Sequence, residues 1–359
     1  DGIGRTLRTV DVRVPLNDPR SPQGTWGRPC ARAAGVPSDA KAFCFNTADS
    51  LTTEWFPQGV TTVSEARADK RWAKERPLLV SWYDEDNREP DRSARVTFIN
   101  TRTGAYQHVL LVWPYRDAQG SPTYEPIGQA SDTGVHAGGL AWYGNRLYVA
   151  DTGSGIRVFD LRRIFDLRRS ENGSTKRRDL VGLHGSTYHA YGYRYVMPQV
   201  LSYVPSKQSG EACTSVGTPT HSWLSIDNGG RDALVTGEWC KNDRGRVAQF
   251  PLTSPATGDL QTDTKGQAIP SSVARLPESH IQGGATANGT WWFTRNESAG
   301  KRPGELLEAE WSNGFKRVQR RSISYGPEDL SCWRSQRRMW TVAEQPGRRA
   351  VYGLPTPSC

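Results

Sequence analysis

The sequence has no apolar segment that approaches the roughly 20 residues needed by a membrane-spanning helix, so we expect no helical membrane span. Methionine is scarce, with 2 of 359 residues, whereas glycine, proline, tryptophan and tyrosine number 36, 23, 13 and 13. Many turn-forming residues and many aromatic side chains are typical of a β-rich protein rather than of a helical bundle.

Short motifs of several common protein classes are also missing. There is no helix-turn-helix, zinc-finger or RNA-recognition signature. There is likewise no G-x-S-x-G elbow, H-E-x-x-H pair or phosphate-binding loop. The segment DNGGRD at residues 227–232 lacks the full ligand series of a calcium loop, so it predicts a turn. We therefore expect no nucleic-acid partner.

The six cysteines include no C-x-x-C pair, which argues against zinc binding and redox catalysis. The sequence alone does not fix their connectivity. Pairing in sequence order would join Cys30 to Cys44, Cys213 to Cys240, and Cys332 to Cys359. Disulfides require an oxidising compartment, and a chain that starts at Asp1 without a signal peptide fits a processed protein. We expect a secreted, extracellular protein.

The formal net charge of +9 favours an acidic partner such as an acidic polysaccharide or cell-wall polymer, although it also lies within the ordinary range for solubility. The basic residues are scattered along the chain, except in LRRIFDLRRSENGSTKRRD at residues 161–179.

A rhythm of three apolar runs occurs five times. The middle runs are LLVSWYD, RLYVADT, ALVTGEW, TWWFTRN and RMWTVAEQ, and the runs that follow them are ARVTFIN, GIRVFDL, GRVAQFPL, GELLEAEW and RAVYGLP. Short β-branched or aromatic runs bounded by Gly, Asn, Asp or Pro predict β-strands. Because a single small sheet buries both faces only against its neighbours, this repeat predicts an all-β fold of the β-propeller type.

We expect a monomer with a single domain over residues 1–359. Five blades is the predicted number, with six or seven left open because the N-terminal region or the long insertion could hold another. Residues 1–55 would contain a closing strand and a disulfide-bearing loop, and residues 162–220 a long insertion between blades. The alternating segment TLRTVDVRVPL at residues 6–16 is the predicted closing strand.

The segments GPEDLSCW, MWTVAEQPGRRAVYGLP, GRVAQFPL and YRYVMPQV resemble secreted single-domain β-propeller proteins of actinobacteria. The resemblance covers most of the chain from about residue 55 onward. It implies the fold and an extracellular location. It implies no activity, because propellers host many functions.

In a propeller, the first strand of each blade begins at the same channel mouth at which the second strand ends. The residues at the predicted first-strand starts are Gln58, His136, His221, His280 with Gln282, and Glu328 with Asp329. Those at the predicted second-strand ends are Tyr83, Asp151, Glu238, Arg295 and Glu344.

These positions supply most of the candidate site residues, and the rest are Trp239, next to Glu238, and Tyr188 with His189 in HGSTYHAYGYRY, an aromatic stretch of the insertion expected to lie over the channel mouth. The candidate catalytic groups are Glu238, Asp151, Glu344, Glu328, His136 and His280. The candidate substrate-binding groups are Trp239, Tyr83, Tyr188, His189, Arg295, Gln58 and His221. Asp329 is the candidate ligand of a metal, for which calcium is considered. Each has a structural alternative, such as a turn cap or an ion-pair partner.

Two classes of function fit this pattern. A carbohydrate-active enzyme would be a glycoside hydrolase with two carboxyl groups about 5–9.5 Å apart, or a uronate lyase. The lyase would use His136, His280, Tyr188 and Arg295 as bases and cation. The alternative is a non-catalytic lectin-like or cell-wall-binding module, or a protein-interaction scaffold. Strong divergence among the repeats favours a single site.

Overall fold

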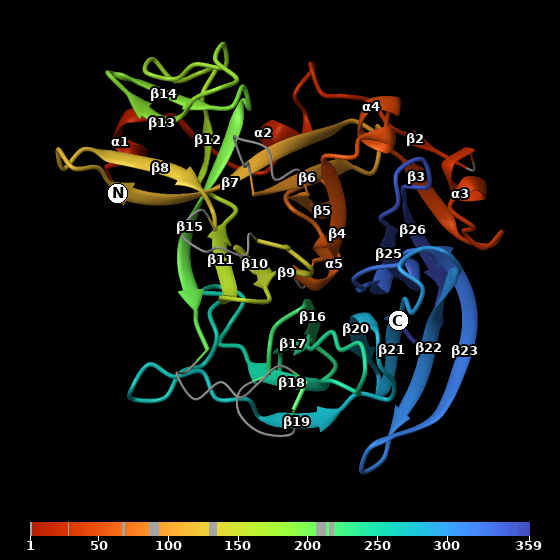
Figure 1. Ribbon diagram of the computed structural model, residues 1–359. Helices are drawn as coiled ribbons and strands as arrows, with labels where there is room; N and C mark the ends of the chain where they lie inside the picture. Colours follow the sequence, from red (N-terminus) through yellow and green to blue (C-terminus); the bar gives the residue numbers. More distant parts are fainter. Residues whose placement is uncertain are drawn as a thin grey trace.

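The computed structural model describes residues 2–27, 29–66, 69–85, 93–128, 135–205, 213–214 and 219–359. Antiparallel four-stranded meanders dominate the fold (Figure 1). The first two are β4 (Trp55–Thr62), β5 (Pro77–Asp84), β6 (Ala94–Asn100) and β7 (Tyr106–Arg116), then β9 (Leu140–Tyr143), β10 (Arg146–Asp151), β11 (Gly155–Asp160) and β15 (Tyr195–Tyr203). A parallel pairing of β7 with β15 joins them into one sheet.

Two further meanders follow along the chain. One is β16 (Trp223–Asp227), β17 (Ala233–Gly237), β18 (Arg246–Pro251) and β19 (Ser272–Arg275), and the other is β20 (Ile281–Ala287), β21 (Thr290–Arg295), β22 (Pro303–Trp311) and β23 (Phe315–Tyr325). The last sheet contains β24 (Ser331–Trp333), β25 (Arg338–Ala343), β26 (Ala350–Pro355), β3 (Lys41–Cys44) and β2 (Thr25–Trp26).

The first strands of the meanders contact one another in the order β4, β9, β16, β20, β24 and back to β4. The sheets are accordingly arranged around a common centre (Figure 1). Strands such as β5 are buried on both faces because neighbouring sheets cover them. This two-sided burial explains why their sequences are continuous apolar runs instead of alternating ones.

The N-terminal region supplies the outer part of the last sheet through β3, in which Phe43 lies opposite Val351 of β26. The prediction that residues 6–16 form this strand is wrong. Those residues contain β1 (Thr9–Val10), which pairs with β12 (Ile164–Asp166), and helix α2 (Arg13–Leu16). Val12 and Leu16 are buried at the helical spacing of four residues.

The remaining elements lie around the meanders. They are the helices α1 (Ile3–Thr6), α3 (Pro29–Ala33), α4 (Thr47–Leu51) and α5 (Val63–Ala66), the 3-10 turn η1 (Arg334–Gln336), and the strands β8 (Pro122–Pro126), β13 (Val181–His184) and β14 (Thr187–Ala190). β15 lies within the predicted insertion at residues 162–220, so part of that stretch is the outer strand of the second meander. Within the described residues, no helix has the length and apolarity to cross a membrane.

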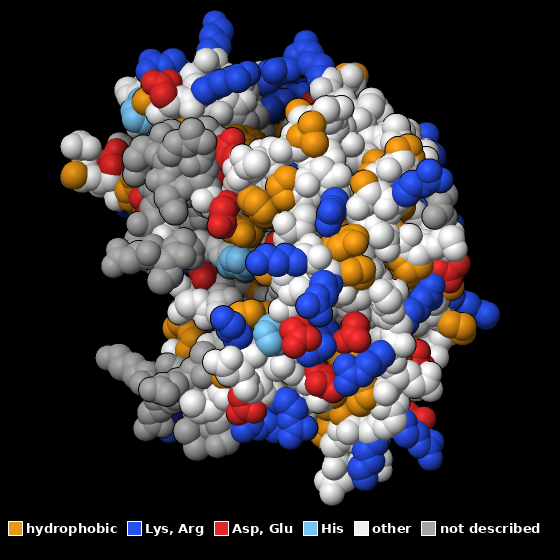
Figure 2. Space-filling view, turned by 45° about the vertical axis from the view of Figure 1, so that its right-hand side comes forward, with side chains coloured by type: hydrophobic (Ala, Val, Ile, Leu, Met, Phe, Trp, Pro, Cys, Tyr) orange, Lys and Arg blue, Asp and Glu red, His pale blue; other side chains and the backbone are white. Residues whose placement is uncertain are grey.

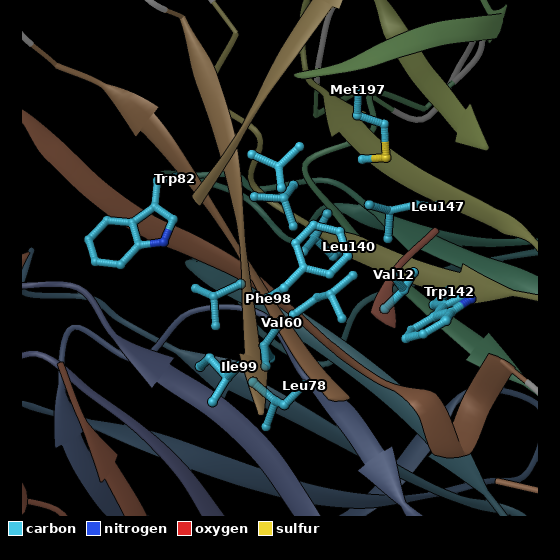
Figure 3. Packing of buried hydrophobic residues seen from close by; sticks show 14 of the residues in the cluster. Val12, Val60, Leu78, Trp82, Phe98, Ile99, Leu140, Trp142, Leu147 and Met197 are labelled. Carbon is cyan, nitrogen blue, oxygen red and sulfur yellow. The ribbon is translucent and has the colours of Figure 1, made fainter. Parts of the chain in front are cut away.

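An extensive apolar core joins the first two meanders and the last sheet, and it includes fully buried Trp82 of β5, Trp142 of β9 and Trp340 of β25. Figure 3 shows Phe98 and Leu140 of this core lying between Trp82 and Trp142. The disulfides Cys30–Cys44, Cys213–Cys240 and Cys332–Cys359 confirm pairing in sequence order.

Candidate functional site

Two glutamates meet where β24 begins and β25 ends. Glu328 is 2% exposed and Glu344 is partly buried, and a hydrogen bond joins their carboxyl groups. The backbone of Glu328 is held in place because the hydroxyls of Thr294 and Thr341 donate to its carbonyl oxygen at 2.6 Å and 3.1 Å. We call these two residues the carboxyl pair.

Amide side chains surround the carboxyl pair. Gln58 Nε2 donates to Glu344 Oε2 at 2.9 Å, and Gln345 Nε2 donates to Glu344 Oε1 at 2.7 Å. Gln282 Nε2 donates to Glu328 Oε1 at 3.3 Å. Asn296 forms a further side-chain hydrogen bond with Glu328. The pair, these four amides and nearby Tyr83, Glu85 and His136 are called the channel mouth below.

The surroundings of the carboxyl pair favour the protonated form of both groups. Burial, followed by the nearby charges of Glu344 and Asp329, raises the pKa of Glu328 well above its usual range. Burial and the charge of Glu85 also raise the pKa of Glu344, against the hydrogen bonds from Gln58 and Gln345. Two carboxyl groups in hydrogen-bond contact do not both ionise readily, so each raises the pKa at which the other loses its proton.

Asp329 lies beside the pair but binds backbone. It is fully buried, and its Oδ2 accepts hydrogen bonds from the backbone N–H of Leu140 at 2.9 Å and of Val60 at 3.2 Å. The side chain thus links the last sheet to the first strands of the first two meanders. Among the described residues, no group of three or more His, Cys, Asp or Glu could hold a metal ion. The role of Asp329 as a calcium ligand stays a prediction.

Tyr83, Glu85 and His136 form the other side of the channel mouth. The rings of Tyr83 and His136 lie 4.3 Å apart between centroids with an angle of 30°. Burial, followed by a hydrogen bond to Glu85, raises the pKa of the Tyr83 phenol. The backbone N–H of Glu85 donates to Glu54 O at 2.8 Å. Glu85 was missed in the sequence because it lies one residue beyond β5.

Glu238 is part of a buried ion pair. Its carboxylate accepts hydrogen bonds from Arg246 Nη2 at 2.8 Å and Arg246 Nε at 3.0 Å, and from the backbone N–H of Thr220 at 3.2 Å. Burial alone would raise the pKa of Glu238, but these hydrogen bonds outweigh it and lower the pKa. This arrangement suits a structural carboxylate better than a proton donor.

Two further predicted site residues, Asp151 and Arg295, form ion pairs within the protein. Asp151 binds Arg157 at 2.7 Å, and Arg295 binds Glu305 at 3.0 Å and Glu297 at 3.1 Å.

His221, Trp239 and His280 lie next to strand ends of the third and fourth meanders. His221 comes before β16, Trp239 follows β17, and His280 comes just before β20. His221 is buried, and burial lowers its pKa to about 4, so the ring is neutral at ordinary pH. Its Nδ1 lies 3.2 Å from Thr236 Oγ1. Trp239 is 39% exposed and contacts the ring of His280 edge-on at 6.0 Å.

Tyr188 and His189 belong to a separate hairpin, β13–β14, and the structure does not bring them to the channel mouth. Tyr188 stacks on Tyr124 of β8 with ring centroids 5.8 Å apart, and its hydroxyl donates to Pro122 O at 2.6 Å. The hairpin covers an apolar cluster beside β8 and β12, which accounts for its aromatic composition.

A basic surface is formed by the N-terminal segment and the residues after β11. Its exposed arginines are Arg5, Arg8, Arg13, Arg162, Arg163, Arg168 and Arg169. Several of them line two neighbouring hollows that share Thr9. Figure 2 shows Lys and Arg side chains gathered along the upper edge of the molecule, at the level of the β13–β14 hairpin in Figure 1.

No protein-family model matches the chain, and no curated protein matches it. Among solved structures, an exo-β-1,3-galactanase from Phanerochaete chrysosporium is similar at 10% identity and a TM-score of 0.41, with coverage of 82% of this chain and 59% of that one. The Cps50 (Swd1) β-propeller domain of Myceliophteria thermophila is 8% identical, with a TM-score of 0.36 and coverage of 83% and 96%. A glucose dehydrogenase is 10% identical, with a TM-score of 0.35 and coverage of 83% and 96%. Similarity at this level decides neither the activity nor the substrate.

Proposed function

We propose that the protein is a secreted five-bladed β-propeller that recognises an extracellular glycan at the channel mouth and hydrolyses it. The blade number is supported by the cyclic order of contacts among the first strands of the meanders. The extracellular location is supported by three disulfides. It also agrees with the resemblance to secreted actinobacterial propellers.

The observation that carries the proposal is the carboxyl pair. A general acid must hold a proton at the working pH and release it to the leaving group in the transition state. Glu328 and Glu344 suit that requirement, because burial and the charge of the neighbouring carboxylate raise the pKa of Glu328, and burial raises that of Glu344. Glu344 is the more exposed member, so it is the one that would face the substrate.

Hydrolysis needs a second carboxylate at about 5–9.5 Å from the acid, which is farther than hydrogen-bond contact. The pair therefore acts as one group, and we assign Glu85 as the opposite carboxylate, since its charge reaches both Glu344 and Tyr83. In this scheme, the pair gives its proton to the glycosidic oxygen. Glu85 then takes a proton from the water that adds to the anomeric carbon.

Hydrolysis is favoured over elimination by the placement of the residues that a lyase would use. Arg295 is already paired with Glu297 and Glu305, so it is a poor cation for a uronate carboxylate. Tyr188 lies on the β13–β14 hairpin, away from the carboxyl pair.

A non-catalytic, lectin-like module is the second candidate. It is favoured by the four amides that already bind the carboxyl pair, because such a network also suits a structural role. In that case, the channel mouth would bind sugar without cleaving it.

The first test is to incubate the protein with neutral and acidic polysaccharides and to follow chain length and the ultraviolet absorbance of unsaturated products. We expect shortening without new absorbance. Glu344→Gln should lower turnover by at least about a hundredfold, as expected for loss of a general acid, while leaving glycan binding intact.

Glu310→Gln, an exposed carboxylate on β22, is the matched control. Full activity of Glu344→Gln would exclude the carboxyl pair as the acid. Binding without shortening of any polymer would favour the lectin-like module.

A further inference from the structure

A groove lies between the β16–β19 and β20–β23 meanders, at the strand ends opposite to those that form the channel mouth. β16 ends there at Asp227, β22 ends at Trp311 and β23 begins at Phe315. Its volume of about 440 Å³ lies within the range of roughly 300–1,000 Å³ that is usual for small-molecule sites. We call it the aromatic groove.

One wall of the aromatic groove is a cluster of three rings. Phe315 contacts Trp311 at 5.0 Å and Trp291 at 5.4 Å, in both cases edge-on. Trp291 in turn stacks on buried Phe293, with centroids 5.9 Å apart and planes inclined by 15°. Trp311 is held by its edge-on contact with Phe315, yet 47% of Trp311 remains exposed. An indole that is both supported and exposed is preorganised to accept a flat apolar ligand face.

The opposite wall presents polar acceptors in a connected network. Gln249 Nε2 donates to Asp227 Oδ2 at 3.1 Å, and the hydroxyl of Ser272 donates to Gln249 Oε1 at 2.8 Å. The backbone N–H of Gly229 donates to Asp227 Oδ1 at 2.9 Å. Carboxylate and amide oxygens each accept more than one hydrogen bond, so Asp227 and Gln249 keep capacity for ligand hydroxyl groups.

The charge of the groove restricts the ligand. Its described lining residues include one carboxylate, Asp227, and neither Lys nor Arg. An anionic ligand would face that carboxylate without a compensating cation. A neutral ligand with hydroxyl donors and an apolar face could bind both walls, with the apolar face on the aromatic rings and the hydroxyl groups on Asp227 and Gln249.

We propose that the aromatic groove is a carbohydrate-binding subsite for a neutral pyranose unit. The C–H face of the sugar would lie on Trp311, and its hydroxyl groups would donate to Asp227 and Gln249. The sequence places these residues in strands far apart, so the site arises only when the two meanders pack together. The subsite is separate from the carboxyl pair and goes beyond the proposed hydrolysis, since it would hold glycan whether or not the channel mouth cleaves it.

The test is calorimetric titration with neutral cello-, xylo-, malto- and galacto-oligosaccharides, with oligogalacturonate as the acidic comparison. We expect at least one neutral series to bind and Trp311→Ala to weaken it by about tenfold or more. Trp311→Phe should restore part of the affinity because it keeps an aromatic face. Trp113→Ala, which removes an exposed indole on β7 outside both the aromatic groove and the channel mouth, is the matched control and should leave this affinity unchanged.

Thermal unfolding of each variant shows that it is folded before binding is compared. The proposal is overturned if no neutral oligosaccharide binds at millimolar concentration. It is also overturned if Trp311→Ala and Trp113→Ala weaken binding equally. Glu344→Gln separates the two proposals. If this variant loses turnover but its groove still binds oligosaccharide, both proposals are supported. If the wild-type protein shows no turnover, only the proposed hydrolase activity is contradicted.

Discussion

Glu65 of α5 is a carboxylic acid enclosed by protein. Its Oε1 accepts a hydrogen bond from the backbone N–H of Cys332 at 2.9 Å, and burial raises its pKa from 4.5 to about 7. Between those two values the folded state holds a proton that the unfolded state has released. The stabilising contribution is therefore fully present below about pH 4.5 and is lost as the pH rises through about 7.

We predict that this group alone removes on the order of 3 kcal/mol of stability between about pH 4.5 and pH 7. Glu65→Gln keeps the shape and cannot ionise, so its free energy of unfolding should lack this component. Urea denaturation of both proteins across that pH range measures the difference. Identical pH slopes for the two proteins would show that Glu65 ionises normally in the folded state.

At the same scale, the sequence locates Glu328 and Glu344 because they occupy repeat-equivalent positions beside predicted strands. It does not show that Glu238 is neutralised, because that depends on the pairing of β17 with β18, which places Arg246 beside it. Tyr188 and His189 were misjudged as mouth residues for a similar reason. Their role is decided by the hairpin that covers β8, which lies outside the repeat.

At the scale of elements, the predicted middle runs coincide with β5, β10, β17, β21 and β25. These strands could be predicted from the sequence because a strand that is buried on both faces consists of a continuous run of apolar residues. The closing strand β3 has four residues and no alternation. β3 pairs with β26, which lies far away in the sequence, so the local sequence pattern around residues 41–44 could not identify β3 as the closing strand.

The disulfide Cys30–Cys44 ties α3 to β3 and closes a loop of sequence separation 14. Replacing both cysteines by alanine should cost about 3 kcal/mol, chiefly because the unfolded chain gains freedom. A freed β3 would also expose the edge of β26, which promotes association between chains.

Thermal unfolding and light scattering of the double variant measure the two effects. Replacing Cys213 and Cys240, which lie away from β3, is the comparison. Equal scattering from both double variants would contradict a special role of β3 at the edge.

At the scale of the whole molecule, the net charge of +9 is unevenly distributed, with seven exposed arginines on the basic surface. We predict that polygalacturonate binds there and that its affinity falls steeply with salt, because exposed charges are screened. Reversing two charges, as in Arg8→Glu with Arg168→Glu, should weaken binding at low salt and flatten the salt dependence.

Lys265→Glu with Arg244→Glu changes the net charge equally on another part of the surface and serves as the control. Affinity measured at several salt concentrations distinguishes the two pairs. An equal loss in both would mean that the polymer responds to total charge and has no preferred surface.

The pairing of Phe43 with Val351 joins the two ends of the chain in one sheet. During synthesis, β3 leaves the ribosome early and has no partner until nearly the whole chain has followed. Completion of this sheet therefore waits until β26 has been synthesised. A chain that terminates before β26 keeps most of its meanders but presents an unclosed interface, which is the kind of surface that quality-control proteases and chaperones engage.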